Sequence, residues 1–147
     1  MSPNQIYVLT PMFACDARLA IAANRAGSVG VLDIGDRFDL QAEEQIRFLR
    51  QHVRNPRRWC VRLSAGSSGS QIDRLQRDDD RTKLIPALIL ADLSSSSDEL
   101  KAAVATGRTV ARHLICEVYS VEQAHQAAAA GFDRVLVKAS ACACSTE

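Results

Sequence analysis

One arrangement recurs along the chain: an alanine-rich helical segment ends at a glycine and leads directly into a short apolar run. It is clearest in residues 19–35, where Gly27 separates LAIAANRA from SVGVLDIG. The arrangement returns in residues 100–118 and 121–138. A helix that ends at a glycine and is followed by an apolar strand is typical of the second half of a βαβ unit. Three such returns in 147 residues predict a parallel sheet wrapped in helices, and so an α/β fold.

Six apolar runs are predicted as strands: residues 5–10, 28–34, 59–63, 83–91, 109–118 and 134–138. Pro86 within the fourth run predicts a bulge or a locally unpaired position, because proline has no amide for the ladder. Polar residues predict helix starts at Asp16, at Asp39 or Gln41, near Asp98 and at Ser120.

We expect six parallel strands in sequential order, curved like an incomplete TIM barrel, because a complete (β/α)8 barrel needs eight strands and usually more than about 200 residues. Residues 1–140 are predicted to form this partial barrel domain, and residues 141–147 an irregular C-terminal tail. In the open doubly wound alternative, of flavodoxin-like type, the first strand would lie in the middle of the sheet.

Composition excludes several classes of partner. The net charge of +1 gives no basic field for nucleic acid, and 5% aromatic residues offer no stacking platform for single strands. No apolar run is long enough to span a membrane, and the first residues lack the pattern of a signal peptide. We therefore predict a cytoplasmic protein with no nucleic-acid or membrane partner.

The five cysteines do not form a framework. Cys60 and Cys116 fall inside apolar strands and are predicted to be small buried hydrophobic residues. Cys142 and Cys144 form a C-x-C pair near the end of the chain, interpreted either as a soft-metal or redox pair or as an accident of the tail. One short pair supplies too few ligands for zinc, so no metal site is predicted.

Polar residues stand where the predicted strands end, which is where ligands gather in parallel α/β folds. Asp33 and Glu117 are placed to accept from a hydroxyl or a ring N–H, and Lys138 to meet an anion or a flavin ring. Carboxylates near helix N-termini are stabilised whatever the function, and a strand-terminal lysine is often simply solvated. We predict that Asp33, Arg62, Glu117 and Lys138 converge on one face of the sheet, and we assign no catalytic residue. Ser64 and Asp92 also stand at strand ends.

Four segments together resemble the nitronate monooxygenase family (2-nitropropane dioxygenase-like), which are FMN-dependent TIM barrels. They are Thr10-Pro11-Met12 and residues 19–35, 60–66 and 117–140. The likeness is greatest to the version attached to polyketide and polyunsaturated fatty acid synthases. The resemblance implies an FMN-dependent oxidoreductase acting on a nitronate or enoyl substrate. It also implies cofactor-binding residues: Thr10, Pro11 and Met12 against the isoalloxazine, with Asp33, Arg62, Glu117 and Lys138 lining the pocket.

The chain departs from this family after its sixth predicted strand. In the family a segment of the type G-x-E-A-G-G follows, wraps the phosphate side of the flavin and often carries the catalytic histidine. Residues 139–144 read ASACAC here, and a glycine needed for close backbone approach cannot be replaced without moving the backbone. We expect the N-terminal portion of such a barrel, with weak or absent FMN binding and self-association through open sheet edges. The alternative is a non-catalytic βα fragment or scaffold that completes its sheet with another chain.

Overall fold

The computed structural model describes residues 5–11, 14–36, 39–64, 72, 75, 84–94 and 96–138. The elements in this part of the chain are, in order, β1 (Tyr7–Leu9), α1 (Ala17–Arg25), β2 (Val29–Gly35), α2 (Leu40–His52), β3 (Trp59–Ser64), β4 (Ile85–Ala91), α4 (Ser97–Gly107), β5 (Ala111–Val118), α5 (Val121–Ala130) and β6 (Arg134–Val137). Strands and helices alternate as predicted, except between β3 and β4, where most of the connecting residues lie outside the described ones. The predicted strands are right to within about two residues at most ends, and β1 is three residues shorter than expected. The predicted tail, with Cys142 and Cys144, lies outside the described residues.

The described strands form one parallel sheet in the order β1-β2-β3-β4-β5-β6. This confirms the sequential order and excludes the doubly wound alternative, because β1 lies at an edge rather than in the middle. The register passes Pro86 without a shift, from Ile85 opposite Ala111 to Ala87 opposite His113. The first of the two predicted alternatives, a bulge, is therefore wrong, and the second is confirmed, because Pro86 itself is the unpaired position. The ladder with β3 begins only at Ala87, after the proline. The register instead shifts in β2, between Asp33 and Gly35.

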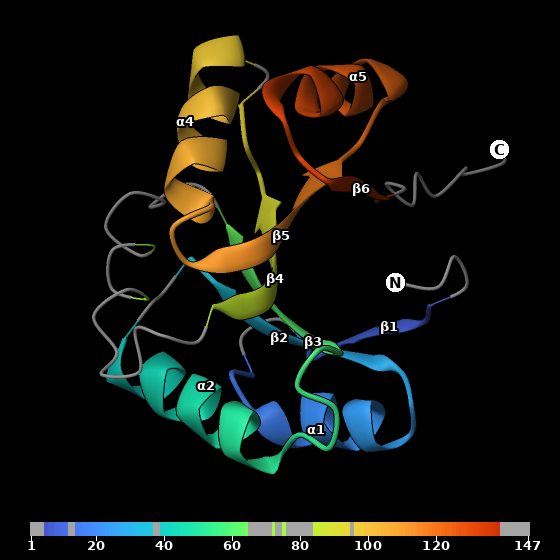
Figure 1. Cartoon of the computed structure of the whole chain (residues 1–147), viewed down its shortest axis with the longest axis vertical. Coiled ribbons are helices and arrows are strands. Elements are labelled where there is room, and N and C mark those ends of the chain that lie inside the picture. The colour runs from blue at the N-terminus through green and yellow to red at the C-terminus, as the bar shows by residue number, and fades with distance from the viewer. Residues whose placement is uncertain are drawn as a thin grey trace, which may run out of the picture.

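The sheet curls, and the helices cover its outer face (Figure 1), with α1 and α2 over the first strands and α4 and α5 over the last. Alternate strand residues face these helices in a large apolar core that includes Leu32, Val61, Leu88 and Leu114. The residues between them line the inner face, where a second, smaller core forms. Its members are Val29, Val31, Cys60, Ala87, Ile89 and Ile115, with Tyr7 and Leu136 packed against them. The molecule is thus an α/β half-barrel with an occupied interior.

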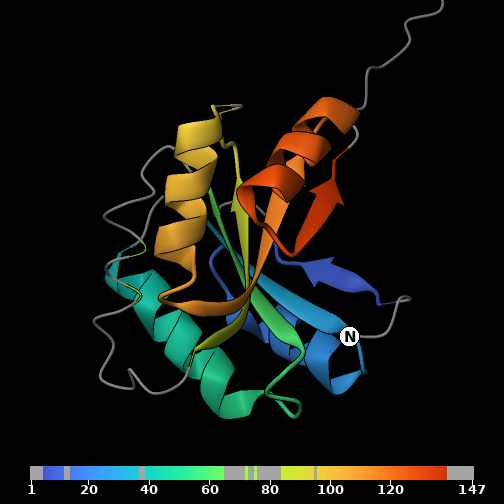
Figure 2. The ribbon, with the colours of Figure 1, turned by 45° about the horizontal axis from the view of Figure 1, so that its top comes forward.

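The curl brings the first and last strands together across this interior. Tyr7 on β1 lies near enough to Arg134 on β6 for that arginine to lower the pKa of the Tyr7 phenol. Figure 2 shows these two strands on the same side of the molecule. Burial raises the Tyr7 pKa against the opposing effect of Arg134, and burial raises the pKa of the nearby Cys60 thiol to about 12. Side chains from opposite edges of the sheet therefore approach each other across the inner face.

Three helices begin at the polar residues that were predicted to cap them. Asp16, Asp39 and Ser120 each cap a helix by accepting from a backbone N–H in its first turn. Gly131 ends α5 in the left-handed region at φ +102°. None of the helices formed by the described residues is long and apolar enough to cross a membrane.

Helix α1 lies unusually close to β2 at Gly30. A Cβ at this position would lie 2.7 Å from the carbonyl carbon and 2.9 Å from the Cα of Ala20, and closer still to its carbonyl oxygen. These are backbone atoms of a helix, so they cannot rotate away. The small residues Ala20 and Gly30 therefore set the distance between the helix and the sheet.

Replacing Gly30 with alanine is expected to lower the free energy of unfolding by about 3 kcal/mol or more, because helix and strand must separate. Urea denaturation followed by circular dichroism measures this. Ala22→Ser, on the exposed side of the same helix, is the matched control and is expected to change stability by less than about 0.5 kcal/mol. Equal midpoints for the two variants would contradict the close contact.

Candidate functional site

Three charged side chains meet inside the half-barrel at the C-terminal ends of the strands. Asp33 lies on β2, Arg62 on β3 and Glu117 on β5. Each follows an inner-core residue by two positions, so strand alternation points all three inward. Together they form a polar layer directly above the inner apolar core, and we call it the charged triad.

Arg62 is held on both sides. Its Nη1 donates to both oxygens of Asp33 at 3.1 Å, while its Nε and Nη2 donate to the two oxygens of Glu117 at 2.8 and 3.0 Å. All three side chains are buried. Buried charges are tolerated only when they are paired and hydrogen-bonded, and bidentate guanidinium–carboxylate contacts provide both.

The Asp33 end of the triad is fixed by its own strand and by the end of β1. The Gly35 N–H donates to Asp33 Oδ1 at 2.9 Å, and the Asp33 N–H donates to the Thr10 hydroxyl at 2.9 Å. Thr10 is buried and so supports the triad, while Pro11 is exposed. Met12 lies outside the described residues.

A second group of polar side chains connects the triad to solvent. Tyr119 Oη lies 3.0 Å from Glu117 Oε1 and 3.2 Å from Asp92 Oδ1. Lys138 Nζ donates to Glu117 Oε1 at 3.3 Å and lies 5.7 Å from the centre of the Tyr119 ring. The Lys138 side chain is 47% exposed and Tyr119 is 45% exposed, so both reach the surface above the triad.

These contacts set the protonation states of the accessible groups. Burial acts to raise the Glu117 pKa, but the hydrogen bonds and charge of Arg62 outweigh it and hold that pKa below its ordinary value. The charge of Glu117 raises the Lys138 pKa. Burial and the neighbouring carboxylates of Glu117 and Asp92 raise the Tyr119 pKa. At neutral pH the site therefore presents a lysine cation and a neutral phenol above an ionised carboxylate.

The two layers have different chemical capacities. Arg62 is enclosed by carboxylates, so it positions Asp33 and Glu117 rather than reaching a ligand. Lys138 and Tyr119 are free to meet one, and both donate hydrogen bonds to anionic or carbonyl oxygens. Within the described residues no group of His, Cys, Asp and Glu side chains is arranged to hold a metal ion.

The predicted convergence of Asp33, Arg62, Glu117 and Lys138 is confirmed as geometry. Sequence reasoning missed Tyr119, which directly follows β5, and treated Asp92 only as a strand-end residue. A further signal at Asp92 is visible only in the structure, where its φ of +56° places a non-glycine residue in the left-handed region.

Comparison with known proteins supports the fold. No known family model and no curated protein sequence matches the chain. Among solved structures it is similar to nitroalkane oxidase from Streptomyces ansochromogenes, with a TM-score of 0.67 and 17% sequence identity. The match covers 90% of this chain and 45% of the oxidase chain, so the chain spans less than half the length of that protein. The class defined by fold and site is an α/β, incomplete TIM-barrel-like domain with a charged layer at the C-terminal ends of its strands.

Replacing Arg62 with methionine is expected to lower the free energy of unfolding by about 3–5 kcal/mol, because two buried carboxylates lose their shared cation. Chemical denaturation measures this, with Arg112→Met on the exposed side of β5 as the control for loss of an arginine. Adding Asp33→Asn and Glu117→Gln to Arg62→Met removes the unpaired charges and is expected to recover much of the stability. A loss below about 1 kcal/mol for Arg62→Met would contradict the structural role of the triad.

Proposed function

We propose that the chain is part of an FMN-dependent oxidoreductase barrel of the nitronate monooxygenase or enoyl-reductase type, in the form associated with polyketide and fatty acid synthases. The observation that carries the proposal is the pairing of Lys138 and Tyr119 at the C-terminal ends of the strands. Active sites of parallel barrels lie at this end. The structural likeness to a nitroalkane oxidase and the sequence resemblance support the same assignment.

The residues at this end fit the ring of a flavin better than its phosphate. Lys138 Nζ and Tyr119 Oη are donors for the ring carbonyls and nitrogens, and the backbone of Thr10, Pro11 and Met12 is proposed to border the ring. Among the described residues that end the strands, Lys138 is the cation that reaches the surface, since Arg62 is enclosed. One accessible cation gives limited attraction for a phosphate dianion, so the affinity of this chain for FMN is proposed to be weak.

Bound FMN would supply hydride transfer. The chain's own contribution is electrostatic and acid–base. Lys138, kept protonated by Glu117, favours negative charge on a ring edge or on a substrate oxygen beside it. Tyr119, kept neutral by its surroundings, can donate its phenolic proton to a substrate carbanion or oxyanion. The substrate class is a small molecule with a conjugated or nitro oxygen function.

Replacing Lys138 with glutamine is expected to weaken FMN binding at least about tenfold, because a charge-assisted hydrogen bond is worth about 1.5–3 kcal/mol. Titration of FMN fluorescence at low salt measures this, with Lys101→Gln on the exposed face of α4 as the control of equal charge change. Unchanged FMN fluorescence up to about 1 mM wild-type protein, a level that corresponds to about −4 kcal/mol, would refute the cofactor assignment.

A second candidate is a non-catalytic scaffold that completes its sheet with another copy or another chain. Two observations support this candidate. The side chains of the charged triad pair with one another and so need no ligand. The edge strands β1 and β6 each pair with only one described strand. Apolar side chains at these edges are uncovered by the described residues, with Ile6 69% and Val137 70% exposed. Unpaired edges with exposed apolar residues favour association.

If these edges associate, the wild-type chain elutes as a dimer or larger species in size-exclusion chromatography with light scattering. Val137→Lys is expected to shift it toward the monomer, because a charge on an edge strand opposes pairing. Val121→Lys, at a 75% exposed position on α5, is the matched control and is expected to leave the mass unchanged. A wild-type chain that stays monomeric at high concentration excludes the scaffold candidate. In the same experiment, FMN that stays bound to the protein in a one-to-one ratio through the column excludes the weak FMN affinity proposed above.

A further inference from the structure

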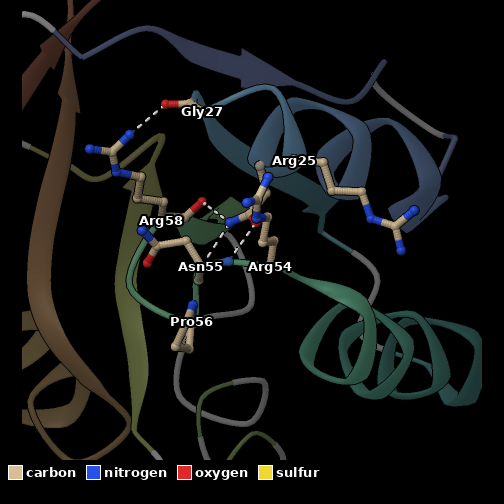
Figure 3. A pocket seen from close by; sticks show the side chains of 7 residues that line it. Arg25, Gly27, Arg54, Asn55, Pro56 and Arg58 are labelled. Atoms are coloured by element: carbon tan, nitrogen blue, oxygen red, sulfur yellow. Dashed lines mark hydrogen bonds between the residues drawn. The ribbon is translucent and has the colours of Figure 1, made fainter.

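A hollow lies at the opposite end of the sheet from the charged triad. It is formed where α1 runs into β2 and where the connection after α2 enters β3, and its volume is about 450 Å³. Figure 3 shows the side chains around it, with Arg58 on one side and Arg25 on the other. The lining residues are Asn24, Arg25, Gly27, Arg54, Asn55, Pro56 and Arg58. We call this hollow the arginine pocket.

The wall of the arginine pocket is held in place by a buried amide. The Asn24 side chain donates from Nδ2 to the carbonyl oxygens of Asn55 and Arg58, both at 2.8 Å. Its Oδ1 accepts from the Asn55 N–H at 2.9 Å. Asn24 therefore uses three of its four possible side-chain hydrogen bonds to fix the connection between α2 and β3. The arginines of this connection project from a backbone that is already ordered, which lowers the entropic cost of binding.

The charge in the pocket has one sign. Three arginines line it and none of its lining residues is acidic. Arg58 Nη1 donates to the Gly27 carbonyl at 2.7 Å, and Arg25 Nη2 donates to the His52 carbonyl at 3.3 Å. These carbonyls lie at the C-terminal ends of α1 and α2, where a cation is favoured by the helix dipole.

Helix capping does not explain why three arginines line this hollow. It uses one donor group of Arg25 and one of Arg58, and neither contact neutralises the charge of the guanidinium. Arg54 makes no such contact with the described residues, and none of the three arginines forms an ion pair within them. Figure 3 shows the guanidinium groups of Arg25 and Arg58 on opposite sides of the hollow. The three positive charges therefore surround the hollow, and an anion seated in it would be attracted by all of them.

We propose that the arginine pocket binds the phosphate or pyrophosphate group of a small phosphorylated molecule. Guanidinium groups present planar paired donors that match phosphate oxygens, which lysine does not. The pocket volume falls within the range of about 300–1,000 Å³ that is usual for small-molecule sites. Because all the described strands are parallel, this site lies at the end of the sheet away from Lys138 and Tyr119, so it is separate from the proposed flavin site.

The test is isothermal titration of the 147-residue chain with inorganic pyrophosphate at low salt. We expect one-to-one binding with a dissociation constant below about 1 mM, weakening as salt is added. Arg54→Gln is expected to weaken binding at least about tenfold, and Arg54→Lys by less, since it keeps the charge but loses the fork. Arg54 is exposed and forms no hydrogen bond or ion pair with the described residues, so both variants are expected to keep the wild-type unfolding midpoint.

The control is Lys101→Gln, which removes one charge from α4 and is expected to leave pyrophosphate binding unchanged. An equal loss of pyrophosphate affinity in Lys101→Gln and Arg54→Gln would mean that the anion responds to the overall electrostatic field of the protein, and it would overturn the site. The absence of binding heat up to about 10 mM pyrophosphate would overturn it as well. Tighter binding of hexaglutamate than of pyrophosphate would overturn the small-molecule assignment and point to an acidic protein segment. None of these outcomes depends on flavin binding, so the two sites fail or succeed separately.

Discussion

The contact of Arg62 with Asp33 and Glu117 fixes the interior of this half-barrel. It joins β2, β3 and β5 across a β4 that presents Ile89 to the inside. Below it the inner core is small, and much of the apolar burial lies between the sheet and its helices. A buried guanidinium between two carboxylates tolerates little change in strand spacing, because a lost partner leaves an uncompensated charge. The triad therefore ties the curl of the sheet to the geometry of its C-terminal end.

Strand direction gives the molecule two ends of different chemistry. All six described strands run the same way, so every strand end of one kind lies at one side of the sheet. At the C-terminal ends of the strands, carboxylates surround one buried cation, Arg62, and one accessible cation, Lys138. The opposite end gathers arginines where α1 and α2 finish. One sheet thus presents a polar cluster suited to a ring or carbonyl at one end and a cationic hollow at the other.

Sequence periodicity predicted the part of this structure that depends on neighbours along the chain. The order of strands, the capping residues Asp16, Asp39 and Ser120, and the convergence of Asp33, Arg62 and Glu117 all follow from where residues stand within each element. Contacts between residues far apart in the sequence do not follow from it. Tyr7 meets Arg134, and Asn24 meets Asn55, only because the sheet curls and because α1 packs tightly at Gly30. The register shift in β2 was not predicted either, although Gly35, which has a positive φ of +66°, stands where it occurs.

The contacts around Glu117 show which of its partners must keep its place and which can be taken over by a ligand. Arg62 contacts both of its oxygens from within the core, whereas Lys138 and Tyr119 contact only Oε1 from the surface side. A ligand can therefore draw Lys138 away without leaving the buried carboxylate unpaired. The same step would be costly for Arg62, because Asp33 and Glu117 would both lose their cation. Lys138 is thus the cation of this site that can serve a ligand, and the buried triad is what allows it to do so.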